Sequence, residues 1–235
     1  MQVSSSSEPI LDPILLHKEL RVLLVYPNTR DVAMANLGFQ QVYSLLNKIE
    51  GVMCDRFAMP VGWKPETQFL DREELRSMDL KIHPLEFDMI AFSISFEPDY
   101  LNTVLALKYF GIPVDREVRG ASFPMITAGG SAIFINPEPL AECMDIMFIG
   151  ECEGMAERFF ALMHENEDRK QFFKRAVSIP GIYLPQHYRP RMEKDLQVGV
   201  SPFEGAPARV VRHWVVQEES LCTHSVLHDE DSTFK

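Results

Sequence analysis

Small and polar residues follow several apolar runs in this sequence, at the points where those runs end. The pair Gly129–Gly130 is the clearest case, because glycine has no side-chain bulk and tolerates positive φ. A ligand could lie flat against the backbone there, although a tight turn explains the pair as well. If the runs are parallel strands, their carboxyl ends gather at one edge of a sheet, where open α/β sheets bind ligands. The candidate cofactor-binding residues at that edge are Pro27, Asn28, Ser93, Ser95, Phe96, Glu97, Gly129, Gly130, Ser131, Gly150 and Glu151.

The side chains of these loops suit ligand contact better than catalysis. The hydroxyls of Ser93 and Ser95 can donate and accept hydrogen bonds, although polar residues are also ordinary at strand ends. Glu97, Glu151 and Glu153 could supply paired carboxylates for acid–base chemistry. Acidic residues also fit the first turns of helices, where they face the positive end of the helix dipole, and we favour that role. The sequence has no HExxH motif and no convincing nucleophile with its base, so we expect no catalytic residue.

Metal and dinucleotide motifs are missing as well. The four cysteines, at positions 54, 143, 152 and 222, include no CxxC pair, so we interpret them as free thiols and expect no metal site. The seven histidines are scattered, which favours structural roles. The residues after the first apolar run read PNTRDVAMANLG, which is neither GxGxxG nor a Walker A motif. Dinucleotide binding of the Rossmann kind is therefore not expected.

Five apolar runs, separated by segments with helical periodicity, must position these residues. Continuous apolar runs indicate parallel strands buried on both faces. The runs cover residues 21–26, 52–57, 87–94, 124–128 and 145–149. Helices are predicted over 33–49, from Glu97–Pro98–Asp99 to Gly111, and over 154–164, with a short amphipathic helix within 61–86. This alternation predicts a doubly wound, Rossmann-like α/β fold with a parallel five-stranded sheet.

The alternation stops after residue 165. Residues 182–184 and 208–216 have the composition of strands, and a polar, proline-containing stretch separates them. We therefore expect a lead-in segment over 1–19, a Rossmann-like domain over 20–166, and a short β-containing connector over 167–235.

The charge and hydropathy of the chain disfavour some classes of partner. The formal net charge is −11, which argues against binding to a nucleic-acid backbone. No apolar run approaches the roughly 20 residues needed to span a bilayer. The N-terminus carries acidic residues and lacks the basic and apolar regions of a signal peptide. We expect no nucleic acid, no membrane and a cytoplasmic location.

An ordered set of segments carries a family resemblance over about residues 20–185. The segments are VLLVYPN, LGFQQVYSLL, SFEPDY, PMITAGG, NPEPLA and the Gly–Glu pair at 150–151. Together they resemble the N-terminal, cobalamin-binding-type domain of radical S-adenosylmethionine (SAM) proteins. The resemblance implies strand ends that face a corrinoid, with its nucleotide tail near Ser93, Ser95, Gly129, Gly130 and Ser131. It also implies a following catalytic domain, in which a CxxxCxxC motif holds a [4Fe–4S] cluster that binds SAM.

Two motifs of such proteins are missing from this sequence. It contains no CxxxCxxC and ends at STFK, so we expect it to stop before the radical SAM domain, which belongs to a C-terminal segment or a partner chain. It also lacks DxHxxG, whose histidine ligates cobalt, so cobalamin would bind without a protein histidine ligand. The expected function is a cobalamin-binding module that is not catalytic by itself. The alternatives are a scaffold domain that keeps the fold without the cofactor, and a small α/β enzyme, for which no catalytic pair was found.

Overall fold

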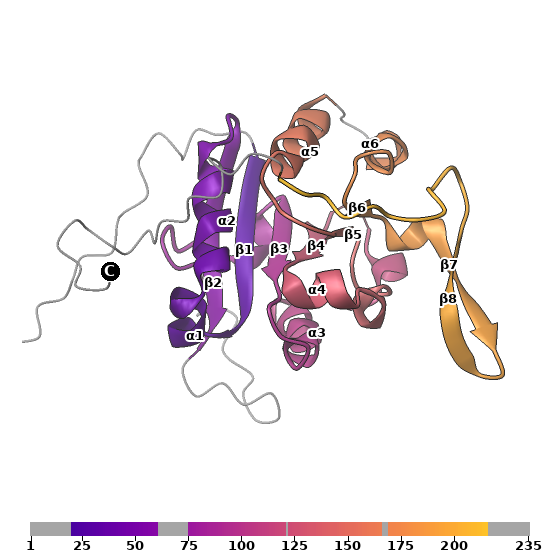
Figure 1. The fold of residues 1–235 in the computed structure, drawn as a ribbon. Coiled ribbons are helices and arrows are strands. Elements are labelled where there is room, and N and C mark those ends of the chain that lie inside the picture. The colour runs from indigo at the N-terminus through magenta and orange to yellow at the C-terminus, as the bar shows by residue number, and fades with distance from the viewer. Residues whose placement is uncertain (1–19, 61–74, 121, 166–168, 216–235) are drawn as a thin grey trace, which may run out of the picture.

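The computed structural model describes residues 20–60, 75–120, 122–165 and 169–215, and its centre is a six-stranded sheet (Figure 1). The strand order is β2-β1-β3-β4-β5-β6. The first five strands pair in parallel, and β6 pairs antiparallel to β5. The strands are β1 (Leu20–Thr29), β2 (Val52–Met59), β3 (Met89–Ser93), β4 (Met125–Gly129), β5 (Ile146–Phe148) and β6 (Ile182–Tyr183). The chain reverses its direction of winding between β1 and β3, where sheets of this order usually form their ligand crevice.

Both faces of the sheet are buried, because successive side chains of a strand point to opposite sides. In β1, Leu23 and Val25 belong to one hydrophobic core, and Val22 and Leu24 belong to the other. None of these four side chains is more than 2% exposed. A strand buried on both faces must be apolar throughout, which explains the continuous run in the sequence. The predicted doubly wound α/β fold is confirmed.

Helices cover the two faces in separate groups. The helices on the face of Val22 and Leu24 are α1 (Arg30–Ala35), α2 (Leu37–Lys48), α5 (Met155–His164) and α6 (Arg169–Ala176). Those on the face of Leu23 and Val25 are α3 (Asp99–Tyr109) and α4 (Ser131–Ile135). Short 3-10 helices occur at Pro84–Glu86, Arg116–Val118, Glu138–Leu140 and Pro185–His187. This arrangement leaves α2 and α5 as neighbours above the middle of the sheet.

Two predicted helices differ from the structure. The helix expected over 33–49 is divided, because Asn36 leaves the helical conformation and caps α2 by accepting a hydrogen bond from the Phe39 amide at 2.9 Å. The short helix expected within 61–86 is absent from residues 75–83, and residues 61–74 lie outside the described part of the chain.

The segment expected as a connector contributes to the main sheet. The predicted strand at 182–184 is present as β6, but it extends the sheet instead of lying beyond it. The stretch at 185–207, expected as a separator, forms a hairpin of β7 (Tyr188–Glu193) and β8 (Leu196–Pro202). The turn residues Lys194 and Asp195 have φ of 47° and 66°, as two-residue hairpin turns require. The strand expected over 208–216 is wrong for its described part, 208–215, where His213 forms an isolated bridge with Gly150.

Buried charges fix residues 75–82 to the outer edge of β2. The guanidinium of Arg56 donates two hydrogen bonds to the Asp79 carboxylate, at 2.9 and 3.1 Å, and lies 4.4 Å from the centre of the Tyr43 ring. The Asp55 carboxylate accepts a bond from the Asp79 amide at 3.1 Å, and burial raises the pKa of Asp55. The Met78 amide donates to the Arg56 carbonyl at 2.7 Å. Because the Arg56–Asp79 pair is bidentate and buried, it holds the loop in one position.

Candidate ligand-binding groove

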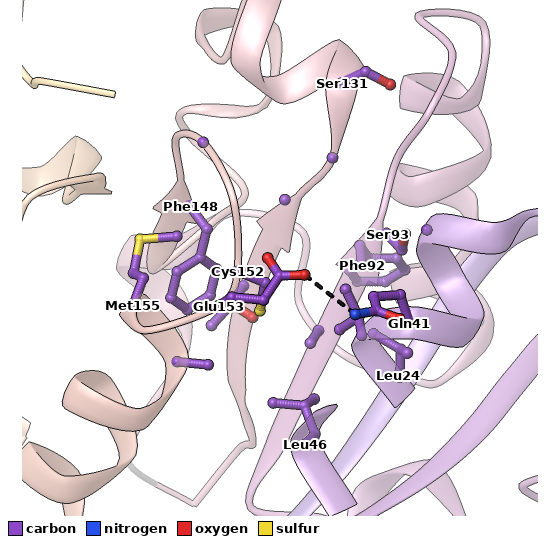
Figure 2. Close-up of a pocket in the computed structure, with 18 of the residues that line it drawn as sticks. Leu24, Gln41, Leu46, Phe92, Ser93, Ser131, Phe148, Cys152, Glu153 and Met155 are labelled. Carbon is purple, nitrogen blue, oxygen red and sulfur yellow. Dashed lines mark hydrogen bonds between the residues drawn. The ribbon is translucent and has the colours of Figure 1, made fainter. Parts of the chain in front are cut away.

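A groove of about 430 Å³ lies over β3 and the carboxyl-terminal half of β4, and it also reaches Leu24 of β1. The sheet forms its floor, α2 forms one wall, and the loop after β5 with the start of α5 forms the other (Figure 2). Small-molecule sites commonly have this size and a mostly apolar lining. Two further cavities, of about 440 and 400 Å³, lie at the amino ends of β1 and β4 and beside the end of β2. The groove lies where parallel sheets bind ligands, so it is the candidate site.

Small side chains on the floor create the groove. Along β4, Met125 packs in the core, and the next two residues on the same face are Thr127 and Gly129. Along β3, the corresponding positions nearest the carboxyl end are Ala91 and Ser93. The side chains on the floor therefore become smaller toward the carboxyl edge of the sheet, and α2 and α5 do not close over them. The space that larger residues would fill is left open.

The walls of the groove are mostly apolar. Gly38, Val42 and Leu46 line it from α2, and Gly38 in the first turn of that helix adds no side chain. Met155 and Phe160 line it from α5. An apolar slot between a sheet and two helices suits a flat, weakly polar group.

Gly129 and Gly130 have different roles. Gly130 has φ of 107° and ψ of 175°, and a Cβ there would lie 2.9 Å from the Ile94 carbonyl carbon and closer still to its oxygen. The fold itself therefore requires glycine at 130. Gly129 is a strand residue, and a Cβ there would meet Phe148 Cβ at an ordinary 3.5 Å. The fold permits a side chain at 129, which would project from the floor into the groove.

Hydrogen bonds within the protein engage most of the hydroxyl and amide groups at the carboxyl end of the groove. Asn36 donates to Ser95 Oγ at 3.0 Å, and Ser131 Oγ donates to the Ser95 carbonyl at 3.2 Å. These bonds join the ends of β3 and β4 to the turn between α1 and α2. The predicted binding residues Ser93, Ser95 and Ser131 thus line the groove, with Ser95 and Ser131 also holding its rim together.

One polar pair spans the groove. Gln41 of α2 donates from Nε2 to Glu153 Oε1 at 3.3 Å, and both side chains line the groove from opposite walls (Figure 2). Cys152, beside Glu153, also lines it. Burial raises the pKa of the Cys152 thiol to about 12, and the charges of Glu153 and Glu157 add to the effect. This thiol is therefore almost entirely protonated at neutral pH, which makes it a poor nucleophile.

The remaining predicted residues are placed differently. Gly150 lines the groove, whereas Pro27, Asn28, Phe96, Glu97 and Glu151 are not part of its lining. Asn28 donates to the Asp99 carboxylate at 2.9 Å and so ties β1 to α3. Phe96 is 58% exposed at the rim of the sheet, and Glu97 is also exposed.

The segment at 212–215 occupies the place next to Gly150. The His213 amide donates to the Ile149 carbonyl at 2.9 Å, and the Glu151 amide donates to the His213 carbonyl at 3.1 Å. Gly150 has φ of 124°, and a Cβ there would lie 2.7 Å from the His213 nitrogen. The Glu151 carboxylate accepts a hydrogen bond from the Val215 amide. Gly150 and Glu151, predicted as ligand contacts, thus hold this segment against the wall of the groove.

Several groove residues were missed in the sequence. Gly38, Gln41, Ala91 and Thr127 line it and were not among the candidates. Ala91 and Thr127 could have been found, because they are small residues that follow Met89 and Met125 on the same faces of their strands. Gln41 gave no such signal, since a polar residue on a helix is usually a surface residue.

The described residues show neither a metal cluster nor a membrane span. Within the described ranges, no three His, Cys, Asp or Glu side chains gather where they could hold a metal ion. No helix of the described chain is both long and apolar enough to cross a bilayer.

A family model described as "Radical SAM proteins, N-terminal" matches residues 38–185, which are 148 of the 235 residues. The matched segment extends from α2 past β6 and includes the floor of the groove and most of both walls. The description does not mention cobalamin. No curated protein and no solved structure matches the chain.

Proposed function

This chain belongs to the family of N-terminal domains of radical SAM proteins, and we propose that it serves there as a cobalamin-binding module. In this proposal the groove takes the nucleotide tail of the corrinoid, and the corrin ring stays outside at the carboxyl edge of the sheet. A bound corrinoid supplies the cobalt–carbon chemistry of the assembled enzyme. The [4Fe–4S] cluster and SAM belong to a further domain or a partner chain, because this sequence has no CxxxCxxC.

The observation that carries the proposal is the small-residue floor at Ala91, Thr127 and Gly129. A domain that kept only the fold would gain stability by filling this space, since each buried methylene contributes about 0.8 kcal/mol. The opening is instead floored by small residues and lined mostly by apolar ones, which suits the planar base of a nucleotide tail. Its volume of about 430 Å³ accommodates a tail of this kind but not a complete corrinoid.

The residues of the groove also agree with binding that uses no histidine ligand. Its described lining contains no histidine. His213 lies beside it, but Nε2 of that ring is 2.8 Å from the Glu153 carbonyl oxygen and is engaged there. The sequence also lacks DxHxxG, so the proposal assigns no histidine of this motif to a corrinoid.

The test is corrinoid binding by variants that fill the groove. The purified chain is titrated anaerobically with hydroxocobalamin and methylcobalamin and passed through gel filtration with absorbance detection. We expect co-elution with the wild-type chain and its loss in Gly129→Leu and Ala91→Leu, which place bulk on the floor from two strands. Gly120→Leu is the matched control, because Gly120 is exposed and a Cβ there has only the Ser122 hydroxyl nearby, at 3.9 Å. Equal retention by all variants would place the site elsewhere.

A scaffold role is the second candidate, and one surface observation favours it. The Arg212 guanidinium lies between the Phe134 and Trp214 rings, 4.1 and 3.6 Å from their centres. Ile135 beside them is 69% exposed, and Trp214 is 58% exposed. Apolar groups arranged in this way are typical of protein-binding surfaces. If no corrinoid is retained at tens of micromolar, this surface becomes the main functional feature.

A further inference from the structure

We propose that Glu153 and Gln41 determine which nucleotide tail the groove accepts, by selecting a base that carries an N–H donor, such as adenine. This inference rests on the proposed function, and it assigns a specificity role to two side chains. Dimethylbenzimidazole, the base of cobalamin, has no N–H group once it is joined to its ribose. Adenine carries an exocyclic amine with two hydrogens.

The geometry places the pair where a tail would pass. Ser131 lies at one end of the groove and Leu46 at the other, with Glu153 and Gln41 between them (Figure 2). The Gln41–Glu153 bond, at 3.3 Å, is long for an N–H to carboxylate contact. A ligand in the groove therefore meets this pair and can exchange its bond for a shorter one.

The existing hydrogen bonds of the groove residues show which donors and acceptors Gln41 and Glu153 leave for a ligand. Asn36, Ser95 and Ser131 already bond within the protein. Thr127 Oγ1 lies 3.5 Å from the Ile90 carbonyl. A carboxylate only accepts hydrogen bonds, so Glu153 can bond a ligand only through a donor that the ligand supplies. Gln41 adds its amide oxygen as a second acceptor, and the bond to Glu153 leaves one of its two N–H groups for the ligand.

The backbone holds Glu153 in position for this role. His213 Nε2 donates to the Glu153 carbonyl oxygen at 2.8 Å. The same segment is fixed by the Glu151 amide and carboxylate, which bond to His213 and Val215. The backbone that carries Glu153 is therefore braced from outside the groove, without help from a ligand.

Charge also orients the ligand. A carboxylate repels a phosphate group, so the phosphate of a nucleotide tail avoids Glu153. The end of the groove near Gly129 and Ser131 has no carboxylate in its described lining. The phosphate thus belongs at the glycine end, which leaves the base beside Glu153 and Gln41.

Three corrinoids test the inference in isothermal titrations of the full chain. They are cobalamin, its analogue with adenine as the base, and cobinamide, which has no nucleotide tail. We expect the adenine form to bind at least about tenfold more tightly than cobalamin, as one added charged hydrogen bond would give. Cobinamide should bind most weakly, because it leaves the groove unfilled.

The variants separate this inference from the proposed function. Glu153→Leu should remove the preference for adenine while cobalamin still binds, and Gln41→Leu, which takes away only the second acceptor, should reduce it. Glu157→Leu, an equal charge change at an exposed position of α5 outside the groove, should keep the preference. Equal affinity of the wild-type chain for cobalamin and the adenine form would overturn the inference and leave the proposed function standing. No binding of any corrinoid, or equal binding of cobinamide, would overturn the proposed placement of the tail and the inference with it.

Discussion

The two adjacent glycines at the end of β4 should respond to the same substitution in opposite ways. Gly130→Ala puts a methyl group against the Ile94 carbonyl, whose carbon would lie 2.9 Å away. That carbonyl cannot retreat freely, because its oxygen accepts a hydrogen bond from the Ala132 amide at 3.2 Å. Gly129→Ala meets only ordinary contacts, the nearest at 3.5 Å from Phe148 Cβ.

The magnitudes follow from these geometries. Alanine at 130 would occupy a backbone region used almost entirely by glycine, at a cost of roughly 1–3 kcal/mol. A displaced hydrogen bond adds about 1 kcal/mol to that loss. Alanine at 129 lies in a strand, where it is favoured over glycine by roughly 0.5–1 kcal/mol because it loses less conformational freedom on folding. The two variants should therefore differ in free energy of unfolding by roughly 2.5–5 kcal/mol.

Urea unfolding followed by circular dichroism measures this difference directly. We expect the unfolding midpoint of Gly130→Ala to fall clearly below that of the wild-type chain. The midpoint of Gly129→Ala should stay at or slightly above it. If the 129 variant loses as much stability as the 130 variant, the assignment of separate roles to the two glycines is refuted. Comparison of both variants in the corrinoid titration then shows whether bulk at 129 affects the groove without affecting the fold.

Three further perturbations test other parts of the structure. Asp79→Asn should lower the free energy of unfolding by about 3–5 kcal/mol, because Arg56 stays buried without its charged partner. A loss below about 1 kcal/mol in urea unfolding would show that the ion pair contributes little to stability. Alkylation of Cys152 at pH 8 should be roughly a thousandfold slower than that of a free cysteine, because its raised pKa of about 12 leaves little thiolate. The alkylation rate should rise about tenfold per pH unit. Mass spectrometry of the labelled peptide measures the rate, and a pH-independent rate would refute the raised pKa. Gly150→Ala should displace the segment at His213, and the His213 amide should then exchange its hydrogen faster with solvent. An unchanged exchange rate would show that the bridge to Gly150 does not hold this segment in place.

The sequence was sufficient for the main sheet but not for its outer parts. β1 and β4 are buried on both faces, and the continuous apolar runs that this burial requires leave few alternatives. The strand at Ile182 and Tyr183 (β6) was predicted, but its pairing with Phe148 and Met147 of β5, which makes it part of the main sheet, was not. That pairing joins positions far apart in the chain, which local patterns do not report.

The candidate site was predicted only in part, because some of its residues are placed by contacts between distant parts of the chain. Six of the eleven proposed residues line the groove: Ser93, Ser95, Gly129, Gly130, Ser131 and Gly150. They were found because strand ends in a parallel sheet converge, whatever the details of the loops. Asn28 and Glu151 are instead engaged by Asp99 and Val215, which lie 71 and 64 positions away. The sequence alone does not show whether a polar side chain bonds to a distant residue or to a ligand, so Asn28 and Glu151 were assigned to a ligand.

The loop that is fixed to β2 has a consequence for how this domain meets other chains. The outer edge of a sheet presents unpaired backbone groups, which invite a strand from another molecule. Along β2 the Met78 amide already bonds to the Arg56 carbonyl, and the buried Arg56–Asp79 pair keeps that loop in place. At the opposite edge, β6 offers a strand of only two residues. Within the described chain, neither edge is a good template for strand addition. Strand addition to the main sheet is therefore disfavoured, and a partner that meets this sheet at its edges should recognise side chains instead of backbone.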